Sequence, residues 1–273
     1  GNDELYRQLF WGPVITLTGR LRERVSFSQA RNTPFQGLAA DGAKRALWKL
    51  TMAGYRLVAF IHDEVLIELP IDADHAAESG QQPPSEPVVF NKFPTAVAAH
   101  GDPIVLPAAS QQVDYEAELV VIIGCHARHV SRDRAMDCVA GFACGHDVSA
   151  RDWQLGKPGG QWLMGKTFDT FAPFGPELVT PDEVGDCGNL GIRLRRNGEV
   201  MQDSNTSQLI FPVDQLISYI SQVCTLEPGD VLYTGTPPGV GVARKPPVFL
   251  QPGDVVEVEI ERVGLLRNPV VEA

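Results

Sequence analysis

Hydrophobic and polar positions follow a helical period in the first part of the chain and a strand period in the rest. Between about residues 36 and 52, apolar residues recur at a partial spacing of about 3.6, which predicts a helix. Two short apolar runs follow, 57–61 and 65–69, and the polar turn 62–64 between them predicts a β-hairpin. Residues 80–87 are rich in Pro, which predicts a linker.

The clearest alternation beyond the linker runs from Val113 to Ile123 and predicts a strand. Polar and apolar residues alternate strictly up to Leu119, so Glu116 and Glu118 are expected on one face, roughly 7 Å apart along the strand. The last four residues are apolar on both faces, so we expect this strand to enter a buried core.

Helix and turn signals separate the remaining β-type runs. Residues 131–139 predict a short helix with Ser131 at its N-cap, and residues 213–223 predict an amphipathic helix. The expected buried face of the second helix comprises Val213, Leu216, Ile220 and Val223. Two similar sequences, 227–230 and 251–254, place Pro and then Gly at the centre of a turn, which favours type II geometry.

Composition and charge are those of a soluble globular protein. The 273 residues suffice for one large domain, or for one domain with an appendage. No apolar run approaches the roughly 20 residues of a membrane helix, so we expect no membrane association. The formal net charge of −11 disfavours nonspecific nucleic-acid binding. Residues 1–72 carry nine basic and eight acidic side chains, and residues 73–273 carry 14 and 26, which indicates segments of different origin.

Cysteine usage indicates a reducing compartment. The five cysteines form an odd set without a CxxC pair, which disfavours a disulfide framework or a cysteine zinc site. We therefore expect reduced, structural thiols. The first residues also lack the basic stretch, apolar core and cleavage site of a signal peptide, so the expected location is cytoplasmic.

Glu116 and Glu118 are the first candidates for chemistry. Two acids on a strand that becomes buried carry a large desolvation cost unless a cation compensates them. Carboxylate oxygens suit Mg²⁺, Mn²⁺ or Ca²⁺. The alternative is a solvated strand face, an interpretation that suits Glu257, Glu259 and Glu261, which alternate with apolar residues near the C-terminus.

Asp147 is the third candidate acid, because it closely follows the apolar stretch 138–144. It could complete a three-carboxylate shell that leaves metal positions for water and a bidentate substrate. The alternative is a capped turn in which Arg151 and Asp152 form a surface pair.

Lys166 and a glycine-rich loop add two possible anion contacts. Lys166 stands among aromatic and small residues, where an ammonium could balance an anionic substrate or an oxyanion. The alternative is an ordinary surface lysine. Residues 234–241 would let backbone N–H groups and hydroxyls approach an anion closely, although alone they indicate only a tight turn.

Five ordered motifs extend from about Asp74 towards the C-terminus. They are Asp74-His75-Ala76-Ala77-Glu78, Tyr115-Glu116-Ala117-Glu118-Leu119, His146-Asp147-Val148-Ser149-Ala150-Arg151-Asp152, Gly165-Lys166-Thr167-Phe168-Asp169 and Thr234-Gly235-Thr236-Pro237-Pro238-Gly239-Val240-Gly241. Together they resemble the fumarylacetoacetate hydrolase family, and the stretches 161–162 and 244–250 resemble one branch of it.

The resemblance implies a β-rich α+β fold, a mixed β-sandwich roll that is usually a homodimer. It implies Mg²⁺ on Glu116, Glu118 and Asp147, with Mn²⁺ or Ca²⁺ as other candidates. The substrate site that it implies comprises Lys166, Gln154 and Thr236 as contacts, with Arg151 supporting them.

The resemblance also implies a lid dyad of His75 and Glu78 that activates water. On a helix, their three-residue spacing places them on one face. This chain departs from the family just before the dyad, because residues 71–73 (Ile-Asp-Ala) replace the usual strand and Asn-Tyr pair. That departure puts the lid geometry in question.

The segment before the departure resembles a different family. Residues 31–41 and the turn 61–65 resemble the C-terminal palm of family A DNA polymerases, in which Asp63 would hold a catalytic metal. Two-metal phosphoryl transfer needs a second carboxylate from elsewhere in the palm and a fingers domain, and neither is recognised in this sequence. We therefore predict a helix-plus-hairpin appendage over residues 1–72 without polymerase activity, fused to a catalytic domain over residues 73–273.

Three hypotheses follow for function. The first is a metal-dependent hydrolase or lyase that cleaves C–C bonds of acylpyruvate-like 2-oxo acids through a metal-stabilised enolate, or a decarboxylase or tautomerase of oxaloacetate on the same site. In it His75, oriented by Glu78, moves a proton and Lys166 stabilises the oxyanion. The second is a metal-binding fusion without turnover, and the third is a DNA-binding remnant that uses the basic residues near Arg31.

Overall fold

The computed structural model describes residues 14–15, 21–22 and 84–273. The chain divides into two compact units, Gly1–Phe60 and Ile61–Ala273. In the first unit, β1 (Val14–Ile15) pairs antiparallel with β2 (Leu21–Arg22). The helix expected at 36–52, the hairpin at 57–69 and the dyad residues His75 and Glu78 lie outside the described residues, and those expectations stay predictions.

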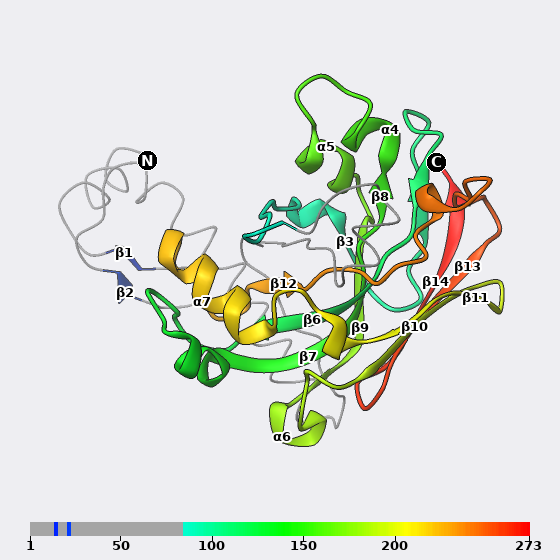
Figure 1. Ribbon diagram of the computed structural model, residues 1–273. Helices are drawn as coiled ribbons and strands as arrows, with labels where there is room; N and C mark the ends of the chain where they lie inside the picture. Colours follow the sequence, from blue (N-terminus) through cyan, green and yellow to red (C-terminus); the bar gives the residue numbers. More distant parts are fainter. Residues whose placement is uncertain (1–13, 16–20, 23–83) are drawn as a thin grey trace, which may run out of the picture. The chain divides into compact units, whose positions relative to one another are not determined.

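Two five-stranded sheets and a small two-stranded ladder build the described part of the second unit (Figure 1). The first sheet has the order β12-β6-β7-β9-β3, antiparallel except where β3 joins β9. Its strands are β3 (Val97–Ala98), β6 (Ala117–Ile123), β7 (Val139–His146), β9 (Ala172–Val179) and β12 (Val231–Tyr233).

The second sheet has the order β11-β10-β13-β14-β4, antiparallel except where β4 joins β14. Its strands are β4 (Ile104–Leu106), β10 (Gly191–Arg196), β11 (Glu199–Asn205), β13 (Val255–Ile260) and β14 (Gly264–Glu272). The ladder pairs β5 (Val113–Asp114) with β8 (Ser149–Ala150). Figure 1 shows the two sheets as curved layers, so the expected β-rich α+β fold is confirmed.

The hydrophobic core lies between these layers. Every residue of β6 is buried, because both faces of this strand are covered. On β13, Val256, Val258 and Ile260 point into the core, whereas Glu257 and Glu259 stay accessible and pair with arginines of neighbouring strands. The solvated-face interpretation of these C-terminal glutamates is therefore confirmed.

The strand expected over Val113–Ile123 is interrupted at Tyr115 and Glu116. On both sides of the interruption the chain keeps one antiparallel register, with β8 before it and β7 after it, because β8 follows β7 along the same neighbouring segment. The Asp114 carboxylate accepts a hydrogen bond from the next backbone nitrogen, that of Tyr115, at 2.8 Å. The prediction of one continuous strand was wrong at this point, and the interruption is where Glu116 stands.

The helix expected over residues 213–223 is α7 (Val213–Val223), with the same bounds. It buries Val213, Leu216 and Ile220, as expected, together with Ile217. The prediction was wrong for Val223, which is 77% exposed because it lies in the last turn, where the chain departs from the core.

Short helical turns join the other strands. The expected turn after Ser131 is the 3₁₀-helix η2 (Arg132–Cys138); Ser131 occupies the N-cap position, but its side chain makes no capping hydrogen bond. The others are η1 (Pro94–Ala96), α4 (Arg151–Gln154), α5 (Trp162–Lys166), α6 (Pro181–Val184), η3 (Thr206–Gln208) and η4 (Gly241–Ala243). Within the described part of the chain, no helix is long and apolar enough to cross a membrane.

Both Pro-Gly turns have the expected geometry. Gly229 and Gly253 have φ values of 101° and 91°, which type II turns require at the third residue. Each turn also has the backbone hydrogen bond from its fourth residue to its first, at 3.0 and 3.1 Å. The five cysteines are free thiols, as expected from their number and spacing.

The buried and exposed sides of α7 give a direct test of the packing. We predict that Ile220→Ala lowers the free energy of unfolding by about 2–5 kcal/mol, because it leaves a cavity under the helix. The matched change Val223→Ala should alter it by no more than about 0.5 kcal/mol. Urea denaturation of both variants measures the difference, and equal losses would show that the helix packs on another face.

Candidate metal centre

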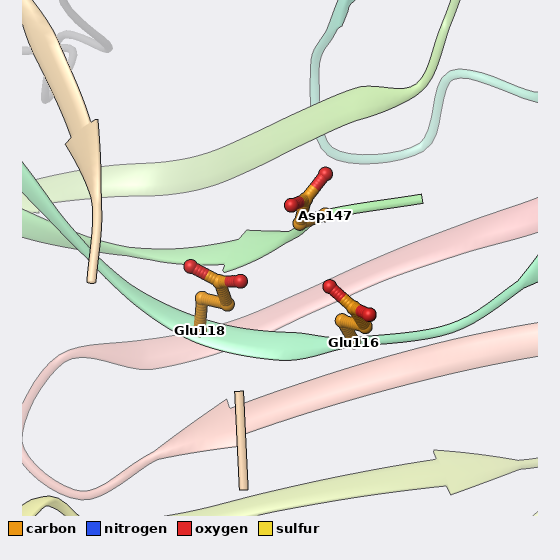
Figure 2. A group of neighbouring side chains, drawn as sticks. All are labelled: Glu116, Glu118 and Asp147. Atoms are coloured by element: carbon orange, nitrogen blue, oxygen red, sulfur yellow. The ribbon is translucent and has the colours of Figure 1, made fainter. Parts of the chain in front are cut away.

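Three buried carboxylates meet at one end of the β6–β7 pair (Figure 2). Glu116 stands in the interruption before β6, Glu118 lies on β6, and Asp147 follows β7. Each offers an oxygen, and these oxygens all lie within 4.8 Å of one another. No residue of the three is more than 1% exposed. Their close approach without bulk water favours a bound cation.

Strand pairing explains why these three residues converge. Glu118 pairs with Gly145 in the antiparallel ladder, and the Asp147 backbone nitrogen donates to the Glu116 carbonyl at 2.9 Å. Asp147 is therefore directly across from Glu116, and Glu118 is two residues along the same strand. The predicted triad is brought together in space; its role as a ligand set belongs to the proposal below.

Lys166 bridges two of the three acids. Its Nζ lies 2.6 Å from Glu116 Oε2 and 2.9 Å from Asp147 Oδ2, and the side chain is fully buried at the end of α5. The surface-lysine alternative is wrong. Helices α5 and α4 pack closely, as Gly165 shows: a Cβ at this position would lie only 2.6 Å from the backbone nitrogen of Gln154.

Lys92 is a second buried lysine at the site, and the sequence analysis missed it. Its ammonium pairs with Asp147 Oδ1 and donates to the carbonyl oxygens of Phe171 and, at 3.1 Å, Val148. Burial lowers the pKa of Lys92, and nearby Lys166 lowers it further, while Asp147 opposes both. Its only sequence signal is a lysine between Phe90 and Phe93, the same kind of signal that singled out Lys166.

Arg151 connects the triad to a fourth buried acid. Its guanidinium pairs with Glu116 and lies 2.8 Å from Asp114 Oδ2. Asp114 also accepts from the backbone nitrogens of Gly241 and Val242, at 2.6 and 2.9 Å. These contacts fix the glycine-rich loop to the ladder beside the site.

The alternative of a surface pair between Arg151 and Asp152 is wrong. Arg151 is 6% exposed and faces inward, whereas Asp152 accepts from Ser110 Oγ at 2.6 Å. Gln154, an expected substrate contact, is buried and accepts from Arg151 Nη1 at 2.8 Å. The structure therefore places Gln154 one hydrogen bond from the arginine that holds Glu116.

The loop after β12 reaches the triad through its backbone. Gly235, with φ 105°, donates its N–H to Glu118 Oε2 at 2.7 Å. The expected anion contact of this loop is thus made, in this structure, to one of the chain's own carboxylates. Thr236 is fully buried in the same loop.

His146 is a neutral imidazole beside the triad. Complete burial, and secondarily the positive charge of Lys92, lower its pKa to about 3, although Glu116 acts in the opposite direction. It therefore adds no positive charge to the site near neutral pH.

The charges of the described residues leave room for a cation. Four buried carboxylates, on Asp114, Glu116, Glu118 and Asp147, face three buried cations, on Lys92, Arg151 and Lys166. A divalent ion would convert this small negative excess into a small positive one, which suits an anionic ligand. The hard oxygen donors fit such an ion, so the triad could hold a divalent metal.

Lys92 provides a test of this charge balance. We predict that Lys92→Met lowers the free energy of unfolding by about 3–5 kcal/mol, because Asp147 loses a buried partner and the carbonyls of Val148 and Phe171 each lose one donor. The control is Lys157→Met, since Lys157 is exposed and lies 4.7 Å above the Trp153 ring; it should cost less than about 1 kcal/mol. Equal stability of the two variants in urea would show that Lys92 is not a buried ion-pair partner of Asp147.

Comparison with known proteins agrees with this architecture. Residues 72–271 match the family described as fumarylacetoacetate (FAA) hydrolase C-terminal. Two solved structures share the fold. One is 5-carboxymethyl-2-hydroxymuconate delta-isomerase from Mycobacterium smegmatis, with 40% identity and a TM-score of 0.69 over 80% of this chain and 82% of that one. The other is 2-hydroxyhepta-2,4-diene-1,7-dioate isomerase from Mycobacterium marinum, with 39% identity and a TM-score of 0.68 over 80% and 78%.

Curated relatives are more similar in sequence. Oxaloacetate tautomerase FAHD2A, mitochondrial, from Bos taurus is 56% identical over 199 residues, which are 73% of this chain and 63% of that protein. Fumarylacetoacetate hydrolase domain-containing protein 2 from Pongo abelii is 54% identical over 198 residues, 72% and 63% of the two chains. This chain thus spans less than two thirds of the length of these relatives. These relatives confirm the branch that residues 161–162 and 244–250 indicated, the one that contains fumarylacetoacetate hydrolase domain-containing protein 2. The chain belongs to the fumarylacetoacetate hydrolase family.

Proposed function

We propose that this chain is a divalent-metal-dependent enzyme that acts on small 2-oxo acids through their enol form. The observation that carries the proposal is the fully buried triad of Glu116, Glu118 and Asp147, with Lys166 bridging two of its members. A structural ion pair alone would not need three acids with oxygens within 4.8 Å of one another.

Mg²⁺ is the proposed ion, with Mn²⁺ or Ca²⁺ as substitutes, because all three donors are carboxylates. A divalent ion bound there supplies Lewis-acid polarisation of the 2-oxo group and its neighbouring carboxylate, which makes the adjacent C–H bond acidic. Three protein donors leave further positions for a bidentate substrate and water.

Lys166 is proposed to stabilise negative charge on the substrate oxygen. Its ammonium is already beside two of the acids, so a positive charge is fixed where that oxygen would become anionic. Arg151 holds Glu116 and Gln154 in place. Gln154 and Thr236 are the proposed substrate contacts, and His75 with Glu78 is the proposed proton-transfer dyad.

Keto–enol tautomerisation of oxaloacetate is the reaction we favour. The curated relatives named oxaloacetate tautomerase are 52–56% identical to this chain, from the Rattus norvegicus protein at 52% to a Bos taurus protein at 56%. Tautomerisation moves one proton between carbon and oxygen and needs no water nucleophile. It therefore requires less of the dyad than hydrolysis does.

C–C bond hydrolysis of acylpyruvates and decarboxylation of oxaloacetate are the second candidates. Both would use the same polarised 2-oxo group, and the isomerase names of the similar solved structures also describe chemistry on unsaturated hydroxy acids with two or three carboxylates. Product analysis separates these reactions, because only decarboxylation releases CO₂. Metal binding with no turnover of any 2-oxo acid would favour the inactive-fusion hypothesis instead.

Assembly and location remain parts of this proposal. We propose a homodimer, a cytoplasmic location, and a boundary between residues 72 and 73 that separates a polymerase-like segment without polymerase activity. The names of several relatives include the word mitochondrial, so cell fractionation is the appropriate check on the location. Sedimentation measures the dimer, and a mobility-shift assay with residues 1–72 tests DNA binding.

Metal dependence is the sharpest test of the function. We predict that EDTA abolishes oxaloacetate tautomerisation and that Mg²⁺ or Mn²⁺ restores it. Glu116→Gln should lower kcat/KM on the order of 100-fold or more, because one anionic donor is lost from the metal shell. The control is Glu257→Gln, on the solvated face of β13, which should retain full activity.

The assay follows the ultraviolet absorbance of the enol form. Undiminished turnover in EDTA would reject the mechanism, whatever the substrate. Loss of activity in the Glu257 control would show that the glutamate changes act on folding and not on the metal.

A further inference from the structure

A buried glutamine on the second sheet reaches into the metal centre. Gln202 lies on β11, is 1% exposed, and makes hydrogen bonds at both ends of its side-chain amide. Its Oε1 accepts from the backbone nitrogen of Ala117 at 2.9 Å. Ala117 is the residue between Glu116 and Glu118, so this bond contacts the backbone that carries two members of the triad.

The hydrogen bond from Ala117 N to Gln202 forms at an edge of β6 that β12 no longer covers. β12 covers the edge of β6 only as far as Tyr233, which pairs with Val120, and Thr234 N then donates to Leu119 O at 3.1 Å. Alternate residues of a strand present their backbone groups to the same side, so the Ala117 N–H points to that same edge. Gln202 Oε1 satisfies this donor where β12 has ended.

The other end of the amide holds the loop after β12. Gln202 Nε2 donates to Thr236 Oγ1 at 2.9 Å and to Pro237 O at 2.7 Å. The network fixes the orientation of the amide, because the Ala117 N–H needs an acceptor and the Pro237 carbonyl needs a donor. Since Thr236 Oγ1 accepts from Gln202, its hydroxyl proton is directed to another acceptor.

A β-bulge explains how Gln202 points inward. In the pairing with β10, Leu194 faces Gln202 but Arg195 faces Val200, so Met201 is an extra residue on β11. Met201 and Gln202 are consecutive and both buried, which a regular strand with one solvated face does not allow. Bulges on edge strands commonly redirect a side chain in this way.

We propose that Gln202 is a positioning residue of the metal centre. Its amide sets the spacing between the glutamate pair and the Thr236 hydroxyl, and it presents that hydroxyl as a donor to an acceptor oxygen of the bound acid. The inference rests on the proposed function, because it assigns the metal to Glu116 and Glu118 and the substrate contact to Thr236. Arg244 supports the same arrangement, since its Nη2 donates to Met201 O at 2.6 Å.

Two substitutions of Gln202 distinguish the acceptor function of its amide oxygen from the donor function of its amide nitrogen. Gln202→Glu keeps an acceptor for Ala117 but removes both donors, so the Thr236 proton would turn to the new carboxylate. Gln202→Met removes both functions. The matched control is Asn268→Asp, because Asn268 is an equally buried amide that donates at 2.8 Å to the carbonyls of Ala99 and Asp102, neither of which belongs to the site.

The probes are Mn²⁺ alone, followed by oxalate in saturating Mn²⁺, both by titration calorimetry. Oxalate presents oxygens on two adjacent carbons, as the carboxylate and the neighbouring enolate oxygen of a 2-oxo acid do. We expect Gln202→Glu to keep its Mn²⁺ affinity and to lose about 10–100-fold in oxalate affinity, with KM raised more than kcat is lowered. Gln202→Met should weaken Mn²⁺ binding as well, and Asn268→Asp should change neither.

Unchanged oxalate affinity in a folded Gln202→Glu protein would overturn the proposal. If that variant does not fold, Thr236→Val decides: it removes only the hydroxyl, and unchanged oxalate affinity there would be equally contradictory. Failure of the unaltered protein to bind Mn²⁺ would reject the proposed function itself. If the unaltered protein binds Mn²⁺ and turns over its substrate, and the Gln202 and Thr236 variants keep the same oxalate affinity, this inference is rejected and the proposed function stands.

Discussion

Charge compensation among buried side chains is the constraint on which this structure depends. Four acids and three cations are enclosed around the break between the β5–β8 ladder and the β6–β7 pair, and each would be costly to bury alone. The surrounding fold serves to keep them paired. The ladder of β5 and β8 carries Asp114 next to Arg151, β6 and β7 align the triad, and α5 carries Lys166 between two acids.

The same constraint connects fold to function. A site that is already close to electroneutral can accept a divalent cation together with an anionic substrate without a large change in net charge. The break between β5 and β6 lies within this arrangement, and the shared register of the two ladders places Glu116 opposite Asp147. The second sheet takes part through Gln202, whose amide links β6 to the loop that carries Thr236.

Local patterns predicted what depends on local geometry. Alternation placed Glu116 and Glu118 together, helical spacing gave the bounds of α7, and Pro-Gly pairs gave two turns. Asp147 and the loop 234–241 were candidates from their local sequence, but the role of Thr236 and the grouping of these parts with the two glutamates needed the family resemblance, because a short stretch of sequence does not show which strands pair. Lys92 and Gln202 were missed since their partners lie 34 to 85 positions away, and a single buried polar residue leaves no periodic signal. Val223 was misassigned because a helical pattern does not show where the core ends.

The central claim is that Glu116, Glu118 and Asp147 together hold one divalent ion. The most direct measurement is anomalous scattering from crystals of the protein grown with Mn²⁺. We expect a single manganese peak in coordination contact with an oxygen of each of the three carboxylates. A well-ordered triad with no peak, and with Lys166 still bridging Glu116 and Asp147 at saturating Mn²⁺, would contradict it.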